Sequence, residues 1–259
     1  MVTLKELLAF FEETAPKVLA EDYDNVGLLI EGQTDEICTL MLALDADEHV
    51  AQQAKAEGAE LVVSHHPLLF HPLKRITESN GTQRTALRFI RDGIGLFAMH
   101  TNFDSASGGL CDSFLQAFGE MEQVTAFSGE AEGLGRIGRL REPCKLSDLL
   151  QRAKTAFNLP HVSYAGDLDR CIQTVAVCNG GGGDIMYQAH ELGADVYISG
   201  DFKHYHARFA VENHFPILLV DHYSAEIGFG RLMQAKLTQR FGDRLRVLIA
   251  DEQNPWRYN

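Results

Sequence analysis

Two adjacent histidines, His65 and His66, stand at the end of an apolar stretch in LVVSHHPLLF, residues 61–70. The run of Leu and Val before them indicates a buried strand, and Pro67 biases the residue before it toward extended backbone. Neighbouring side chains on a strand point to opposite faces. At the end of a strand, however, the two rings can diverge and still face one cavity. The pair therefore suits two metal ions, with each imidazole serving a different ion.

Other metal-binding side chains follow strands farther along the chain. The stretch HTNFD brings His100 and Asp104, and DHYSAE brings His222 and Glu226, which share one face if a helix begins there. A carboxylate such as that of Glu226 can bridge two cations. Mixed nitrogen and oxygen ligands suit zinc, manganese, iron, cobalt or nickel better than calcium. The predicted ligands of two divalent metal ions are His65, His66, Asp104, His222 and Glu226.

Three side chains are candidates for catalytic roles. Glu226 would bridge two ions about 3.5–4 Å apart and hold a water whose pKa they lower. His100 precedes Asp104 by four residues and is either a proton shuttle or a partner of a ligand. His204, in SGDFKHYH, is a second candidate for proton transfer. A polar position at the start of a surface helix explains His204 equally well.

An alternating order of strands and helices must position these residues. EGAELVVSHH aligns with LGADVYISGD and places Ser64 over Ser199, which we interpret as an internal duplication of a βαβαβ unit, with chance similarity as the alternative. Ligands bind outside the carboxyl ends of strands in open α/β sheets, and the polar residues above fall at such ends. The expected strands are 37–45, 61–66 and 94–100 in the first half and 171–179, 196–201 and 216–220 in the second, the last followed by the polar exit DHYSAE.

The predicted fold class is therefore α/β, with two related lobes built on mixed sheets. Residues 1–125 form the first lobe, which carries the HHP and HTNFD motifs. Residues 126–216 form the second lobe. Residues 217–259 form a C-terminal segment that returns to the first lobe with the HxxxE motif.

Composition narrows the class of protein. The chain has 259 residues, 45% of them hydrophobic, and a net charge of -13. This charge argues against a nucleic-acid polymer as partner, and no apolar run is long enough to span a bilayer. The N-terminal stretch has neither a basic leader nor a cleavage site for a signal peptide. Five scattered cysteines without a CxxC pair indicate reduced thiols. We expect a cytoplasmic protein.

Two further motifs leave alternatives open. VCNGGGGDIM sets a glycine run between a strand and a helix, where it forms either a phosphate cradle or a tight turn packed against the metal site. Asp184 would repel a phosphate there, and we interpret it as the N-cap of the following helix. In GLGRIGRL, we interpret Arg136 and Arg139 as outward-facing strand charges, with an anion site as the alternative.

Several stretches together resemble a known family, the dinuclear-metal GTP cyclohydrolase I type 2 homologues, also called Nif-three-like proteins. The resemblance implies the same five metal ligands, and the length resembles the short form without an inserted middle domain. Short members form a ring-shaped homohexamer with the metal sites facing an internal cavity. The matching stretches are YDNVGLLIEG, SHHPLLF followed by PLKRI, HTNFDSASGG, GLGRIGRL, VAVCNGGGGD, GADVYISGD and DHYSAEIG.

One position departs from the family pattern. The family usually has glycine before the late histidine, and this chain has Asp221 before His222. The carboxylate of Asp221 either orients His222 or caps a helix.

The predicted function is dinuclear metal-dependent hydrolysis of a small molecule, of the GTP cyclohydrolase type 2 kind, and a nucleotide is one candidate substrate. A non-enzymatic metal-binding or metal-delivery protein is the alternative. The hydrolase and the metal-delivery protein need the same ligands. An enzyme also needs a substrate pocket beside the metals and keeps its metals bound, whereas a carrier exchanges its metals readily. A purely structural scaffold is a third class.

Overall fold

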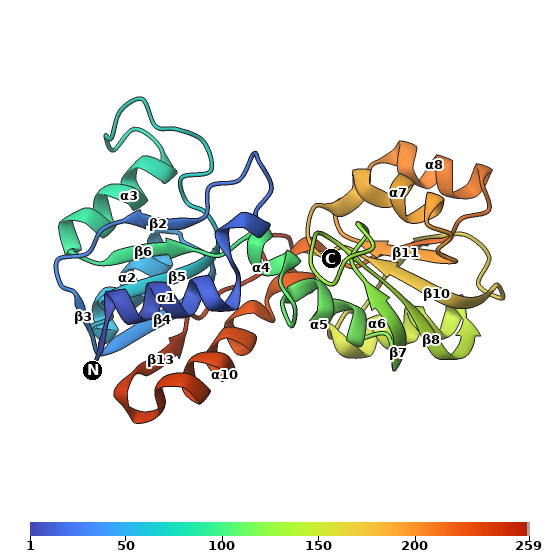
Figure 1. The fold of residues 1–259 in the computed structure, drawn as a ribbon. Coiled ribbons are helices and arrows are strands. Elements are labelled where there is room, and N and C mark those ends of the chain that lie inside the picture. The colour runs from blue at the N-terminus through green and yellow to red at the C-terminus, as the bar shows by residue number, and fades with distance from the viewer. Residues whose placement is uncertain (258–259) are drawn as a thin grey trace. The chain divides into compact units, whose positions relative to one another are not determined.

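The computed structural model describes residues 1–257, which form two compact units (Figure 1). The first unit contains Met1–Phe103 and the chain from Gly228 onward, and the second contains Asp104–Ile227. The chain thus passes between the units directly before Asp104 and again just after Glu226. The lobe boundaries expected after residues 125 and 216 stay a prediction, because they follow motifs along the chain, whereas the units follow packing.

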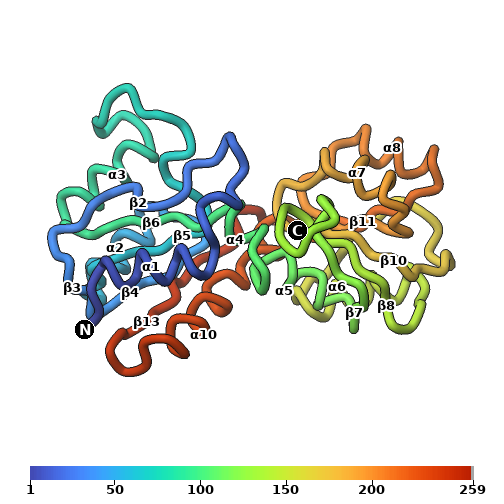
Figure 2. Tube along the Cα trace, in the orientation of Figure 1, coloured from blue at the N-terminus to red at the C-terminus, as the bar shows by residue number. Residues whose placement is uncertain are grey.

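The first unit is built on a five-stranded sheet with the order β13-β4-β5-β6-β2. Four of these strands are parallel, and β2 at the edge is antiparallel. The C-terminal strand β13 pairs with β4, so the red end of the chain in Figure 2 lies beside an early strand. The strands are β4 (Thr39–Asp45), β5 (Leu61–His66), β6 (Gly95–Ala98), β13 (Arg246–Ile249) and β2 (Gly27–Ile30).

Helices cover this sheet, and local signals fix where they begin and end. The N-caps of α2 and α3 are Asp47 and Asn80, whose side chains accept hydrogen bonds from backbone N–H groups of the first turn. Both helices end at a left-handed glycine, Gly58 and Gly93. The elements are α1 (Leu4–Thr14), α2 (Glu48–Glu57), α3 (Gly81–Asp92) and α10 (Phe229–Phe241), with a short pair β1 (Val2–Thr3) and β3 (Glu36–Ile37).

The second unit is built on a six-stranded sheet with the order β7-β8-β10-β11-β12-β9. Its strands are β7 (Met121–Thr125), β8 (Arg136–Lys145), β9 (Ser163–Ala165), β10 (Cys171–Val177), β11 (Val196–Ser199) and β12 (Ile217–Leu219). Its helices are α5 (Leu110–Gln116), α6 (Leu146–Ala156), α7 (Met186–Glu191), α8 (His204–Glu212) and α9 (His222–Glu226). The short helix α4 (Thr101–Ser105) contains the point where the chain enters this unit.

Each sheet contains a parallel trio of strands in chain order, with helices between them. The trios are β4-β5-β6 and β10-β11-β12, and both pair in parallel. Most residues of these strands are buried, as expected for parallel strands covered on both faces. The predicted α/β class with mixed sheets is confirmed, and the repeated trio is the arrangement that a duplication predicts.

The interpretation of Arg136 as an outward-facing charge is wrong. Its side chain is buried, and its guanidinium donates to Asp112 Oδ1 at 2.5 Å and to the backbone carbonyls of Ser105 and Ala106. A buried charge persists only when it is paired and hydrogen-bonded in this way. Arg139, three residues on, is exposed as expected. Arg136 therefore ties β8 to the end of α4, directly after Asp104.

Candidate metal centre

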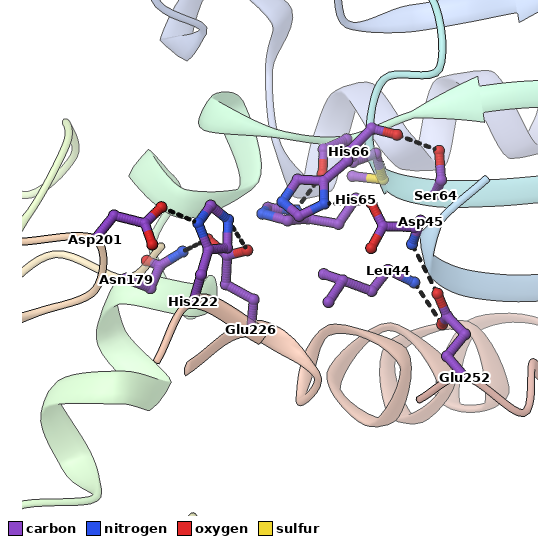
Figure 3. A network of polar contacts seen from close by, with 11 residues as sticks. Leu44, Asp45, Ser64, His65, His66, Asn179, Asp201, His222, Glu226 and Glu252 are labelled. Atoms are coloured by element: carbon purple, nitrogen blue, oxygen red, sulfur yellow. Dashed lines mark hydrogen bonds and ion pairs between the residues drawn. The ribbon is translucent and has the colours of Figure 1, made fainter. Parts of the chain in front are cut away.

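The two adjacent histidines are the last residues of β5, and each is held through its Nδ1 atom. His65 Nδ1 lies 2.8 Å from the carbonyl oxygen of Met99. His66 Nδ1 lies 2.8 Å from Asp45 Oδ1, at the end of β4 (Figure 3). Since both partners are hydrogen-bond acceptors, both Nδ1 atoms carry the proton. The Nε2 atoms are then the ones with a lone pair for a metal.

His100 joins this pair from the exit of β6. Its Nδ1 lies 2.8 Å from Asp24 Oδ1, and Asp24 Oδ2 also accepts from Thr101 at 2.5 Å (Oγ1) and 3.0 Å (N). Burial would raise the pKa of Asp24, but the hydrogen bonds from His100 and Thr101 outweigh it and lower the pKa to about 2. One candidate ligand atom from each of His65, His66 and His100 lies within 4.8 Å of the others. The first unit thus brings three imidazoles together.

The strand end that orients His66 is itself fixed by the C-terminal segment. The carboxylate of Glu252 accepts from Leu44 N at 2.7 Å and from Asp45 N at 2.8 Å (Figure 3). Burial raises the pKa of Glu252, and these two backbone donors offset part of that rise. Glu252 therefore holds the backbone that presents Asp45 to His66.

In the second unit, His222 and Glu226 occupy the first and last positions of α9. His222 Nδ1 lies 2.7 Å from Asp201 Oδ2, and His222 Nε2 lies 2.9 Å from Glu226 Oε2 (Figure 3). Burial lowers the pKa of His222, but hydrogen bonds to the two carboxylates raise it to about 10. The two carboxylates therefore favour the charged form of the ring.

The amide of Asn179 connects the two predicted carboxylate ligands. Its Nδ2 donates to Asp104 Oδ1 at 2.8 Å and to Glu226 Oε1 at 3.0 Å. Its Oδ1 accepts from the Sγ of Cys111 at 2.9 Å. Since ionised carboxylates only accept hydrogen bonds, the NH2 end of the amide faces them. The sequence reasoning missed Asn179. The available signal was its position two residues after β10, at a strand exit like those of the predicted ligands.

The glycine run after Asn179 is explained by close packing against the ligands. Gly180 adopts a left-handed backbone with φ of 60°. A Cβ there would lie 2.0 Å from Glu226 Oε1 and 3.1 Å from His222 Nε2. Only glycine fits at such a close approach. This packing favours the tight-turn interpretation over a phosphate cradle.

Three other candidates are placed differently. Asp184 is not the N-cap of α7, since Ile185 occupies that position, and its carboxylate instead lies 3.0 Å from Nε2 of the buried His206. Asp221 is the N-cap of α9. The carboxylate that hydrogen-bonds Nδ1 of His222 is that of Asp201. His204 is exposed at the start of α8, and its catalytic role stays a prediction.

The residues of each unit fit a divalent transition metal. Four imidazoles are held through Nδ1 by a carbonyl or carboxylate oxygen, which is the usual way proteins orient histidine ligands. Carboxylate oxygens accompany the imidazole in the second unit. This mixture of nitrogen and oxygen donors suits zinc, iron, manganese, cobalt or nickel. The four rings are those of His65, His66, His100 and His222.

Fold and site together define an α/β protein of two units that presents imidazoles and carboxylates suited to a metal ion at strand exits. Residues 2–255 match the model of the family Duf34/NIF3 (NGG1p interacting factor 3), and the chain belongs to that family.

The relatives carry two kinds of name. "GTP cyclohydrolase 1 type 2 homolog" of Clostridium perfringens is 31% identical over 96% of each chain. The Lactococcus lactis protein of the same name is 36% identical over 78% of this chain and 79% of its own. "Protein NIF3 homolog" of Schizosaccharomyces pombe is 31% identical over 86% of this chain and 84% of its own. The expected family resemblance is confirmed.

Solved structures agree on the fold. A hypothetical protein of Staphylococcus aureus matches 100% of this chain and 99% of its own with a TM-score of 0.88 at 24% identity. Reduced HcgD of Methanocaldococcus jannaschii matches 97% of this chain and 98% of its own with a TM-score of 0.84 at 27% identity. Within residues 1–257, the helices are too short or too polar to cross a membrane.

Proposed function

We propose that the chain is a dinuclear metal-dependent hydrolase of small molecules, of the cyclohydrolase kind that its relatives' names suggest. The observation that carries the proposal is the shared orientation of the four imidazoles, each bound through Nδ1 within its own unit. A buried histidine without a ligand role is hydrogen-bonded too, as His206 is to Asp184, so the argument depends on the repetition of the pattern. The same pattern at four strand exits favours ligand duty over chance.

The ligands of the two ions would be the five residues expected from the sequence. When bound, divalent ions supply Lewis acidity and lower the pKa of a water toward about 7. The chain passes between its units beside Asp104 and Glu226, so these carboxylates stand at the two connections. The proposed ligands are His65, His66, Asp104, His222 and Glu226.

The chain's own residues would then handle the proton. Asp24 fixes the ring of His100 through Nδ1, so its Nε2 can give or take a proton beside the other two imidazoles. Glu226 would contribute a carboxylate oxygen as a base, with Asn179 holding its other oxygen. His204, at the start of α8, is the second candidate for proton transfer.

Location and assembly complete the proposal. All five cysteines are free thiols, which suits the cytoplasm. The family resemblance suggests a homohexamer. A nucleotide is one candidate substrate, and neither a nucleic-acid polymer nor a membrane is among the proposed partners.

The test is a substrate screen with metal-loaded protein against nucleotides and phosphoesters. Elemental analysis should give two metal ions per chain, and Glu226→Gln should lower turnover per bound ion pair more than it lowers occupancy. A plateau at one equivalent contradicts the dinuclear site, and unchanged turnover per ion pair removes the catalytic role of Glu226. No turnover, together with rapid loss of metal to a weak chelator, would favour a metal-delivery protein.

A further inference from the structure

The first unit contains a cavity of about 750 Å³ that the proposed ligands do not use. Its size falls within the range of ligand pockets, about 300–1,000 Å³. The walls come from two of the stretches that carry the family resemblance, YDNVGLLIEG and the loop after HHP, and from α3. Apolar side chains dominate, among them Leu29, Leu69, Leu73, Ile76 and Ile90.

Two aromatic rings connect this cavity to the histidine cluster. Tyr23 and Phe70 both line it, with ring centroids 6.3 Å apart. The ring of Phe70 lies 6.2 Å from that of His100, centroid to centroid. Asp24, which orients His100, lines the cavity as well. A molecule in the cavity would therefore have one end beside the imidazole to which we assign proton transfer.

The charge of the cavity restricts what can enter. The charged side chains in its lining are Asp24 and Glu31, and no lysine or arginine of the described chain takes part. Lys74 and Arg75 follow Leu73 but are exposed and outside the lining. The Asp24 side chain is buried and hydrogen-bonded to His100 and Thr101, so Glu31, which is exposed, is the carboxylate that an entering anion would meet. It disfavours a phosphate, and the lining has no cation to pair with one, whereas aromatic walls attract neutral or cationic rings.

We propose that this cavity binds the ring-bearing part of the substrate, and that this part is uncharged or cationic. The proposal rests on the proposed hydrolase only for the statement that the bound molecule is a substrate. A nucleotide would thus enter with its base alone, and its phosphates would stay outside. The substrate class is an apolar or heteroaromatic ring compound without an anionic group on the ring.

The test uses two dyes that share one ring system and differ in charge, with metal-free full-length protein. Neutral N-phenylnaphthylamine should bind one per chain in a fluorescence titration. The sulfonate analogue, anilinonaphthalene sulfonate, should bind several-fold more weakly, because its anion meets Glu31 and finds no cation in the lining. Glu31→Lys should lower the dissociation constant of the sulfonate dye several-fold, because it reverses one charge beside the anion. It should leave the dissociation constant of the neutral dye unchanged.

A matched pair of variants locates the binding. Ile76→Asp adds a charge to the cavity wall and should weaken the neutral dye about tenfold or more. Val211→Asp adds the same charge to α8 in the second unit, at a side chain of similar exposure (54% against 49%), and should change nothing. Equal effects of both variants, or no saturable binding of the neutral dye, would overturn the site. Equal affinity for the two dyes would overturn the exclusion of anions. Because no metal or turnover is involved, these outcomes are separate from failure of the hydrolase.

Discussion

Replacing Asn179 by alanine should weaken metal binding while the second unit stays folded. The amide hydrogen-bonds both Asp104 and Glu226, at 2.8 and 3.0 Å, through one oxygen of each carboxylate. Alanine removes both hydrogen bonds and opens a space the size of an amide. The two carboxylates then lose their fixed orientation.

The size of the effect follows from the two hydrogen bonds that alanine removes. Hydrogen bonds to charged groups contribute about 1.5–3 kcal/mol each, so the free energy of unfolding of metal-free protein should fall by about 3–6 kcal/mol. Residues that orient metal ligands typically change affinity by about 10–100-fold. We expect a reduction in that range for zinc or cobalt.

The thiol of Cys111 provides a graded test of the same idea. It donates to Asn179 Oδ1, the end of the amide that faces away from the carboxylates. Cys111→Ala leaves the buried amide oxygen without its donor, loosens the amide that holds both carboxylates, and should weaken metal binding several-fold, roughly the effect of one neutral hydrogen bond. Cys111→Ser keeps a donor and should restore most of the affinity.

Metal affinity is measured by competition with a chelator, and cobalt absorption reports the ligand geometry. Urea unfolding of metal-free protein gives the stability change separately. Gln83→Ala is the control, since Gln83 is a buried amide of the first unit whose Oε1 accepts from Thr77 and Ser79, away from the predicted ligands. It should lose stability and keep wild-type metal affinity. Wild-type metal affinity of Asn179→Ala, or an equal reduction in the control, would refute the reasoning.

Three further outcomes are expected. Gly180→Ala should lower metal affinity sharply in the chelator assay, since its Cβ would lie 2.0 Å from Glu226 Oε1. Gly181→Ala is the control and should keep wild-type affinity, because the nearest atom to its Cβ would be 3.8 Å away. The pKa of Asp24 is lowered from 3.8 to about 2. Its ionised form therefore adds up to about 2 kcal/mol to the free energy of unfolding above pH 4, and this contribution is lost as the pH falls from about 4 through 2. The gap in urea midpoint between wild type and Asp24→Asn should therefore narrow from pH 5 to pH 3, and a constant gap would contradict this. Light scattering should give a mass several times 28.8 kDa, and a monomer would contradict the hexamer.

The fold and the histidine positions followed from local patterns in the sequence. Apolar runs ending in polar residues indicated the strand exits, and parallel strands place such ends on one edge of a sheet. The end of β5 at His66 and the helix from His222 to Glu226 both lie where these patterns predicted. These features depend on neighbours within a few residues, which a single sequence displays.

The side chains that orient the ligands could not be predicted in this way. Asp24 lies 76 residues from His100 in the chain, and Asp45 lies 21 from His66. In the sequence each is an ordinary acidic residue at a turn or a strand end. For Arg136 the prediction was wrong in the opposite direction. Strand charges are commonly exposed, but Asp112 and the carbonyls of Ser105 and Ala106, which hold this buried one, lie far away in the sequence. Long-range pairing decides such positions.

The repeated trio of strands explains why the two units contribute different chemistry from equivalent places. Ser64-His65-His66 at the end of β5 corresponds to Ser199-Gly200-Asp201 at the end of β11. In the first unit this exit presents two imidazoles. In the second it presents Asp201, which holds His222, and a glycine whose Cβ would meet the carbonyl oxygen of Gly180 at 2.5 Å. The second exit thus supplies a carboxylate in place of imidazoles and permits the close backbone approach that lets Gly180 pack on Glu226. A histidine in place of Gly200 would not restore a ligand there, because its side chain would push away the turn that the carboxylate contacts.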